Sequence, residues 1–202
     1  MPDAFPLPQG HARPGGERLP LPAPAAMNPQ QRAAAQALID GPRKGIYGPF
    51  LPLLRSPALL ERMGKVGEYL RFESVLDARI RELATCAAAR HVSNQFEWVM
   101  HAPLAVKAGV AEAAVEALRV GARPKQLAAD EEVALDFLRE LLQTQGVSDP
   151  TYASAHAAFG EQGVVELASL IGYFAMVCWV MNVARTPAQA GAADPGLDAF
   201  PS

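Results

Sequence analysis

The sequence predicts an all-α protein, a compact bundle of about seven to eight helices. Apolar residues recur at helical spacing along most of the chain, and no stretch shows the period-two alternation of a strand between turn signals. Helix-opening pairs recur as well, with Asn28-Pro29, Ser56-Pro57 and Asp149-Pro150 as the clearest examples. Half of the 202 residues are hydrophobic, which is enough for the core of one domain.

The predicted helical domain covers residues 28–187, between two segments of different composition. Residues 1–27 are dense in proline, which blocks helix and sheet hydrogen bonding, so we expect a disordered or polyproline-like arm. Residues 188–202 are expected to form a disordered tail. Met27 directly precedes a helix start, so a natural start at that residue is an alternative. No continuous apolar run opens the chain, and a signal peptide is not expected.

The first half of the domain is expected to contain three helices and one long loop. Residues 28–39 form the first helix, which Gly and Pro close. Residues 41–57 combine Gly and Pro with a large apolar content, which favours an ordered loop over the core. Residues 77–91 form a helix capped by Asp77. Between the loop and the helix that Asp77 caps, residues 57–72 are expected to form a helix. Their apolar side chains recur at helical spacing: Leu59, Leu60, Met63, Val66 and Leu70.

The second half begins with a helix that either Ser93 or Asn94 caps, and in which Pro103 predicts a kink or a restart. Asp130 is predicted to cap a strongly amphipathic helix further along the chain. Two shorter helices are also expected, at about 111–121 and 149–160.

The last predicted helix, residues 161–185, is apolar on nearly all sides and almost long enough to span a membrane. Glu166 and Asn182 interrupt it, and no basic cluster flanks it. These features favour a helix central in the bundle or buried between subunits. A membrane span is the less favoured alternative.

Composition excludes several classes of function. A net charge of −3 and a pI near 5.8 give no electrostatic signature of nucleic-acid binding. Cys86 and Cys178 are too few for a disulfide scaffold or a thiolate metal site, and they fit a reducing cytoplasm. No HExxH motif, phosphate-binding loop or nucleophile elbow is present, and we expect neither metal nor cofactor.

Residues 82–101 contain the best candidate for a site. Asn94, Glu97 and His101 lie at i, i+3 and i+7, so they share one face of a helix that is otherwise strongly apolar. Such polar groups need partners or a pocket. The alternative is an ordinary solvated Glu97–His101 pair. Glu82 precedes a run of small apolar residues, so it is either a buried carboxylate or a surface carboxylate beside arginines.

The run RELATCAAARHVSNQFEWVMHAPLAVKAGV resembles the carboxymuconolactone decarboxylase family, within the alkylhydroperoxidase D-like (AhpD-like) superfamily. The resemblance extends from about residue 48 through YLRFES to GYFAMVCWVMNVARTP at 172–187. The peroxidase branch of the family has a glutamate, eleven residues, and then Cys-x-x-Cys-x-x-x-His. Counted from Glu82, Asn94 and Glu97 occupy the two cysteine positions, and His101 occupies the histidine position. Because thiol peroxidases need a reactive thiolate and a resolving thiol, this departure argues against that reaction.

The resemblance then implies a cofactor-independent decarboxylase or lactone-type isomerase, in a role such as the catabolism of aromatic compounds, acting on a small carboxylated substrate. In this hypothesis His101 is the acid/base and is oriented by Glu97, and Glu82 orients it or relays a proton. Asn94 or a nearby arginine stabilises the oxyanion. Further candidates for substrate binding are Arg71 and Arg90 for a carboxylate and Trp98, Phe72 and Tyr173 as pocket walls.

The resemblance also implies a homo-oligomer (a dimer, trimer or hexamer) with the last helix as a plausible interface. A non-catalytic oligomeric protein that uses the same pocket for binding or sensing is the alternative from another functional class.

Overall fold

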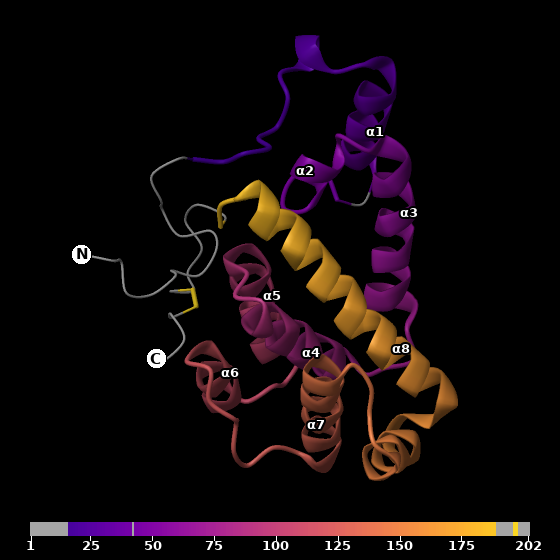
Figure 1. The fold of residues 1–202 in the computed structure, drawn as a ribbon, viewed down its shortest axis with the longest axis vertical. Coiled ribbons are helices and arrows are strands. Elements are labelled where there is room, and N and C mark those ends of the chain that lie inside the picture. The colour runs from indigo at the N-terminus through magenta and orange to yellow at the C-terminus, as the bar shows by residue number, and fades with distance from the viewer. Residues whose placement is uncertain (1–15, 42, 189–195, 198–202) are drawn as a thin grey trace, which may run out of the picture.

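The computed structural model describes residues 16–41, 43–188 and 196–197, and in these ranges the chain forms eight α-helices and no extended strand (Figure 1). The predicted all-α class is confirmed. A 3₁₀ turn, η1 (Pro24–Ala26), precedes the helices, and a π-helical turn, η2 (Tyr69–Glu73), follows α3. The helices are α1 (Pro29–Asp40), α2 (Phe50–Leu53), α3 (Pro57–Glu68), α4 (Ala78–His91), α5 (Gln95–Lys107), α6 (Glu112–Arg119), α7 (Ala129–Thr144) and α8 (Asp149–Ala184).

Helix α4 lies at the centre of the bundle and packs against α5, α6, α7 and α8. Its middle is almost entirely buried and rich in alanine, and small side chains let neighbouring helices approach closely. Ile80 and Leu83 supply the larger buried contacts. Figure 1 shows α8 crossing the bundle diagonally, with α3 beside it.

Helix α8 consists of two helical segments that meet at Gly160, whose φ of 69° and ψ of 177° are not helical. The two predicted helices, 149–160 and 161–185, correspond to these segments. The second segment is the apolar one. By length and composition α8 is able to cross a membrane, but 56% of its most apolar window is buried in the fold, as in core helices of soluble proteins.

Parts of the two chain ends lie within the described residues, and there they contact the helical domain. In the arm, the Arg18 amide donates to the carbonyl of Ala184, and Arg55 donates to carbonyls in residues 19–20. Proline-rich backbone leaves its carbonyls without partners of its own, so a guanidinium can collect several of them. In the tail, Leu197 is buried, and its backbone N–H and C=O both bond to the Gln95 side chain. Residues 1–15, 189–195 and 198–202 lie outside the described part of the chain.

The predicted helix boundaries hold with three differences. Residues 50–53, predicted as part of a loop, form the short helix α2. Pro103 lies inside a continuous α5 and does not restart it. Asp130 is not the cap of α7, because Ala128 occupies that position. The backbone N–H of Ala128 donates a hydrogen bond to the Glu131 carboxylate. Asp130 instead accepts hydrogen bonds from the Glu131 N–H and from Arg79.

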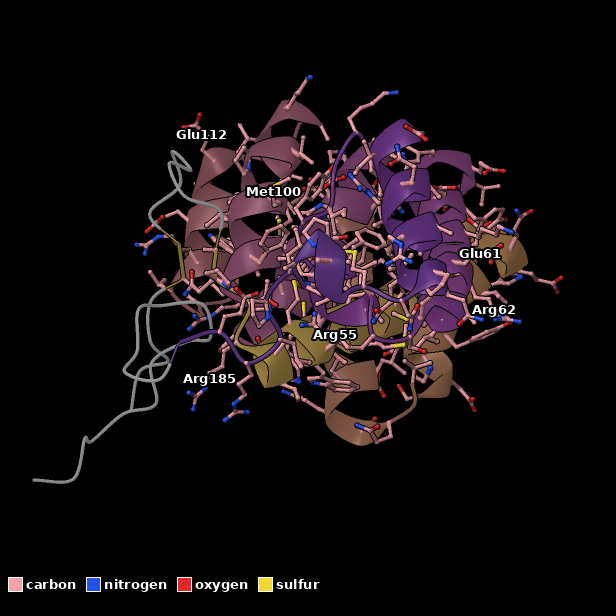
Figure 2. All side chains as sticks on the ribbon, turned by 90° about the horizontal axis from the view of Figure 1, so that it is seen from above. Arg55, Glu61, Arg62, Met100, Glu112 and Arg185 are labelled. Atoms are coloured by element: carbon pink, nitrogen blue, oxygen red, sulfur yellow. The ribbon has the colours of Figure 1, made fainter. Side chains whose placement is uncertain are left out.

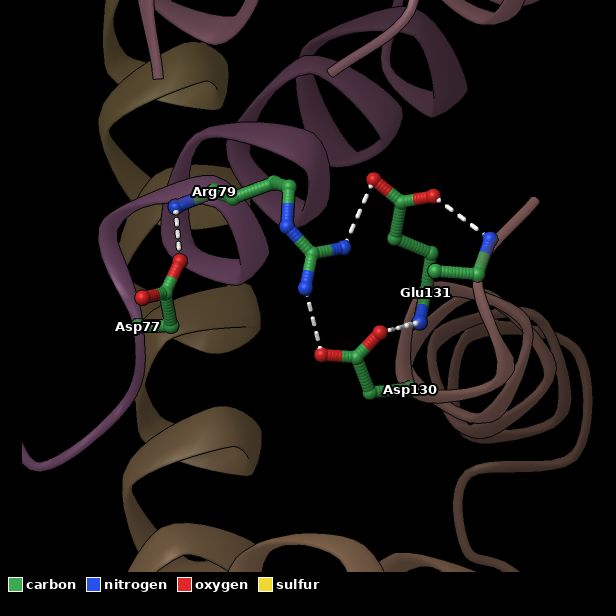
Figure 3. Close-up of polar contacts among 5 residues, drawn as sticks. Asp77, Arg79, Asp130 and Glu131 are labelled. Carbon is green, nitrogen blue, oxygen red and sulfur yellow. Dashed lines mark hydrogen bonds and ion pairs between the residues drawn. The ribbon is translucent and has the colours of Figure 1, made fainter. Parts of the chain in front are cut away.

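Arg79 joins the beginnings of α4 and α7 (Figure 3). Its guanidinium lies 2.6 Å from a carboxylate oxygen of Asp130 and 2.8 Å from one of Glu131. The backbone N–H of Arg79 donates to the side chain of Asp77, the cap of α4. The pKa of the Asp130 carboxyl is lowered mainly by its hydrogen bond to Arg79. A sequence pattern can place a carboxylate near a helix start, but it does not show that the carboxylate faces an arginine from another helix.

The π-helical turn η2 is fixed to α8 by Glu166, which is 4% exposed. One carboxylate oxygen accepts from the Tyr69 hydroxyl at 2.6 Å and from the Gln162 amide. The other accepts from the Ser74 hydroxyl at 2.5 Å and from the Val75 N–H. Burial would raise the pKa of Glu166, but these hydrogen bonds outweigh burial and lower the pKa to about 2. The charged form of Glu166 is therefore part of the fold.

We expect Glu166→Gln to lower the free energy of unfolding at pH 7 by about 2–4 kcal/mol, because several buried donors lose a charged acceptor. Since the pKa of Glu166 is lowered in the folded state, its contribution is complete above 4.5 and is lost as the pH falls through about 2. The deficit of the variant relative to wild type should therefore shrink towards pH 2. Urea titrations of both proteins at several pH values measure this difference in the free energy of unfolding. Glu161→Gln, an exposed carboxylate on the same helix, is the control; equal effects of both changes would refute this role.

Candidate active site

A pocket opens where the loop before α2, the turn η2, the face of α5 and the middle of α8 meet. His101 and Glu97 lie in its wall, one helical turn apart on α5. Both side chains are nearly buried, at 4% and 5% exposure. The pocket is lined by Arg43, Tyr47, Pro49, Phe50, Arg71, Phe96, Glu97, Met100, His101, Leu104, Tyr173, Phe174 and Val177.

The imidazole of His101 is held between two carboxylates. Its Nδ1 lies 2.6 Å from Glu82 Oε2, and its Nε2 lies 3.2 Å from Glu97 Oε2. Glu82 reaches it from α4, behind the pocket, whereas Glu97 is part of the pocket lining. The ring of Phe174 packs edge-on against the imidazole, with centroids 5.0 Å apart. The three residues predicted as catalytic thus lie together.

The two carboxylates determine the charge on His101. Burial lowers the pKa of the imidazole, but the hydrogen bonds that it donates to Glu82 and Glu97 outweigh burial and raise the pKa to about 9. At neutral pH the ring is therefore an imidazolium that donates from both nitrogens. In this state the pocket-facing N–H is an acid ready to give a proton, and Glu82 stabilises the charge from behind.

Asn94 has a structural position that differs from the predicted one. Its side-chain oxygen caps α5 by accepting from the Glu97 N–H at 2.9 Å, and its amide donates to Asn182 and to the Cys178 carbonyl. It is 1% exposed and does not line the pocket. Because both ends of the amide are bound within the protein, the structure gives no support to Asn94 as an oxyanion donor. It orients the first turn of α5, and thereby Glu97.

Three other predicted substrate contacts lie away from the pocket. Trp98 is fully buried in the core, because one step along a helix turns a side chain about 100° away from Glu97. Arg90 is buried towards the end of α4 and is not among the lining residues. Phe72 is 67% exposed, and its ring lies under the Arg71 guanidinium, 5.1 Å from it.

Arg71 and Tyr173 do line the pocket, as predicted. Within the described residues, Arg71 forms no ion pair or hydrogen bond, and its Nε is buried without a partner. Its guanidinium lies over the neighbouring Phe72 ring. Tyr173 likewise has no hydrogen-bond partner in that part of the chain. Burial is the main reason that the pKa of Tyr173 is raised to about 12, so its hydroxyl remains a donor at neutral pH. The pocket thus has an uncommitted cation and an uncommitted hydroxyl donor.

Sequence reasoning missed Arg43, which contributes a second guanidinium to the lining. It donates to the Gly64 carbonyl, lies 3.7 Å from Glu68, and stacks over the Phe50 ring at 4.5 Å. The predicted ordered loop over residues 41–57 could have pointed to Arg43, because a loop that lies over the core brings its polar side chains to any pocket beneath it.

The cysteines are remote from this chemistry. Cys86 and Cys178 are fully buried and absent from the pocket lining. Burial raises the pKa of the Cys178 thiol well above its usual value, which disfavours the thiolate. Among the described residues, no group of three His, Cys, Asp or Glu side chains is arranged to hold a metal ion.

The fold occurs in solved structures of low sequence identity. The AhpD core of an uncharacterized peroxidase-related protein from Ralstonia eutropha JMP134 is 16% identical, with a TM-score of 0.69 over 89% of this chain and 95% of that chain. An uncharacterized peroxidase-related protein from Silicibacter sp. TM1040 is 16% identical, with a TM-score of 0.68 over 91% and 97%. A protein of unknown function from Agrobacterium tumefaciens, a putative antioxidant defence protein AhpD, is 17% identical, with a TM-score of 0.59 over 68% and 95%.

The model of the carboxymuconolactone decarboxylase family matches residues 57–140, which include Glu82, Glu97 and His101. Over these residues the chain is similar to the carboxymuconolactone decarboxylase family, and its fold is that of the AhpD-like structures. A search of curated proteins gave no match. The predicted resemblance and fold are therefore confirmed, whereas the reaction has to be inferred from the site of this particular chain.

Two glycines of α3 test how Tyr173 is placed. A Cβ on Gly67 would lie 2.2 Å from the Tyr173 hydroxyl oxygen, whereas a Cβ on Gly64 would meet no atom closer than 3.9 Å. We expect Gly67→Ala to displace the Tyr173 ring and to lower the free energy of unfolding by about 1–3 kcal/mol. Gly64→Ala should be neutral or stabilising by up to about 1 kcal/mol, since alanine favours the helix. Denaturant titrations compare them, and indistinguishable variants would contradict the close packing at Gly67.

The charge on His101 gives a second prediction. We expect the imidazole to titrate near pH 9 in a ¹³C-detected NMR titration, with His101→Asn removing the resonance and so assigning it. Because the pKa is raised in the folded protein, the charged ring stabilises the fold fully below pH 6.5, and this stabilisation is lost as the pH rises through about 9. Glu82→Gln should lower the pKa, since one of the two carboxylates is removed. A His101 that titrates at or below 6.5 in wild type would refute this arrangement.

Proposed function

We propose that this protein is a cofactor-independent enzyme that decarboxylates or isomerises a small carboxylated substrate, such as a conjugated lactone, by acid–base chemistry. The observation that carries the proposal is the imidazolium of His101, held between two carboxylates in a pocket with an unpaired arginine and no cysteine. Thiol peroxidation lacks its nucleophile in this pocket, whereas proton transfer has its donor in place.

The uncommitted guanidinium of Arg71 favours a substrate that carries a carboxylate, because an arginine binds a carboxylate through two parallel hydrogen bonds. A carboxyl group that leaves as CO₂ must lose its negative charge, and a bound arginine would oppose that loss. In a decarboxylation, Arg71 therefore holds a carboxylate that stays on the substrate. In an isomerisation it holds the carboxylate of an intact substrate.

In the decarboxylation, the C–C bond to the leaving carboxylate breaks, CO₂ departs, and the electron pair moves onto the conjugated carbonyl as an enolate. The Tyr173 hydroxyl donates a hydrogen bond to the enolate oxygen, in the role that the sequence assigned to Asn94. The Nε2–H of His101 then protonates carbon, and water returns a proton to the ring. Glu97 accepts the N–H before the reaction, and Glu82 keeps the ring charged.

The pocket limits the substrate to a small molecule. Its cavity volume is about 80 Å³, well below the roughly 300–1,000 Å³ of most ligand pockets. Tyr47 at 42% exposure and the Arg43 side chain, at 10% exposure, come from the loop before α2 and also line the pocket. A compact lactone acid, such as one formed in the catabolism of aromatic compounds, suits this volume. The buried reduced cysteines agree with a cytoplasmic location for the reaction.

We expect wild-type protein to release CO₂ from, or isomerise, a carboxylated lactone, and His101→Asn and Glu97→Gln to lower kcat by about 10²–10⁴-fold. Arg71→Lys should mainly raise KM, because a lysine cannot form the paired hydrogen bonds. Cys86→Ala and Cys178→Ala serve as controls and should keep kcat, since neither thiol reaches the pocket.

Full turnover by folded His101→Asn would exclude the proposed site. If wild type turns over no carboxylated lactone but binds one, with affinity that Arg71→Lys weakens, the pocket serves binding or sensing. Loss of a dithiol-dependent peroxidase activity in the cysteine variants would overturn the acid–base mechanism.

A further inference from the structure

Helices α1 and α3 lie side by side (Figure 1), and a second cavity, here called the α1–α3 cavity, lies between them. Its volume is about 540 Å³, within the range of roughly 300–1,000 Å³ that ligand pockets usually have, whereas the pocket around His101 measures about 80 Å³. Figure 2 shows Glu61, which lines the α1–α3 cavity, well to one side of Met100, which lines the pocket around His101. Arg43 lines both cavities.

The helical walls of the α1–α3 cavity consist largely of small side chains. Five of them come from the two helices: Ala33, Ala34, Ala37, Ala58 and Gly64. Leu38 and Leu60 add buried aliphatic surface. The distance between packed helices depends on the side chains at their contact, and small ones allow a close approach. Here the two helices leave the space open, so its apolar walls are available to a ligand.

Arg43 brings an incompletely bonded cation to the α1–α3 cavity. Its side chain is 10% exposed, and in the described part of the chain its Nε is buried without a hydrogen-bond partner. One Nη donates to the Gly64 carbonyl, and the guanidinium lies over the Phe50 ring. A buried N–H that lacks an acceptor is costly, so a ligand that supplies an oxygen at this point gains affinity.

The carboxylates that line the α1–α3 cavity leave the charge of Arg43 poorly compensated. Glu68 lies 3.7 Å from Arg43, too far for a hydrogen bond, and its side chain is 41% exposed. Glu61 is paired with Lys65 at 2.8 Å on the exposed surface of α3. A ligand carboxylate that approaches Arg43 to hydrogen-bond distance therefore makes a stronger contact than Glu68 does, and Glu68 is able to turn towards solvent.

We propose that the α1–α3 cavity binds a linear monocarboxylate of medium chain length. Its carboxylate accepts hydrogen bonds from Arg43, and its alkyl chain lies between α1 and α3, where it is removed from water. Such a ligand engages a guanidinium that also lines the pocket around His101, without entering that pocket. The site does not rest on the proposed reaction, because α1 and α3 hold the ligand.

Isothermal titration calorimetry of the full chain with butanoate, hexanoate, octanoate and decanoate tests the alkyl part of the site. Each methylene that becomes buried raises the association constant by up to about fourfold, so we expect a gain of at least about fourfold for each added pair of methylenes until the cavity is full. 1-Octanol has the chain without the carboxylate, and it should bind at least about tenfold more weakly than octanoate.

A pair of phenylalanine variants locates the alkyl chain. Ala37→Phe fills the α1–α3 cavity from an exposed position of α1 and should weaken octanoate binding at least about tenfold. Gln36→Phe is the matched control, because Gln36 is exposed on the same helix and does not line the cavity. It should bind octanoate as wild type does.

Three further variants locate the carboxylate. Arg43→Met removes the donors, keeps an apolar side chain, and should weaken octanoate at least about tenfold while leaving 1-octanol unchanged. Glu68→Gln should strengthen octanoate binding about twofold to fivefold, since a nearby negative charge is removed. Arg71→Met removes a cation that lines the pocket around His101 and not the α1–α3 cavity, so octanoate binding should stay unchanged.

Octanoate binding that Arg71→Met abolishes would place the ligand in the pocket around His101 and overturn the proposal. An affinity that does not depend on chain length, unchanged binding in Ala37→Phe, or no binding of any of these carboxylates would overturn it as well. Because every readout is binding, none of these results depends on whether the protein turns over a carboxylated lactone.

Discussion

The placement of one imidazole between two carboxylates is the constraint on which the site depends. A buried histidine with a single acidic neighbour can remain neutral, but Glu82 and Glu97 together hold His101 as an imidazolium. That charge has to be created by residues from two helices, since Glu82 comes from α4 and the other two residues from α5. The contact between α4 and α5 is therefore part of the chemistry as well as of the core.

The rest of the pocket is held by polar contacts that act at a distance from it. Glu166 accepts hydrogen bonds from Tyr69 in the π-helical turn and from Val75 just after it, and so holds in place the turn that brings Arg71 to the pocket. Asn94 fixes the first turn of α5 and bonds to the end of α8. π-Helical turns are rare, and they are frequent at functional sites. Here the turn serves the residue that recognises the substrate in the proposed mechanism.

Much of the fold could be predicted because its signals are local. Asn28 and Asp77 cap their helices as predicted. The apolar spacing of residues 57–72 predicted one helix there, and the structure forms α3 followed by the π-helical turn in its place. The grouping of Glu97 and His101 on one side of α5 follows from helical geometry alone. Predictions were wrong where a residue serves a partner distant in sequence. Asp130 binds Arg79 in place of capping α7, and the tail docks through Leu197 on Gln95.

By itself the sequence determined the helical class, the family resemblance and the set of residues that can move protons. These depend on periodicity, on caps and on the identity of residues at fixed spacing. Only the tertiary structure decided that Glu82 reaches His101, that Asn94 is used by the backbone, and that Arg43, Arg71 and Tyr173 share one pocket. The reason is physical: hydrogen bonds and charge effects act over a few ångströms in space, and the chain separation of the groups involved carries no information about that distance.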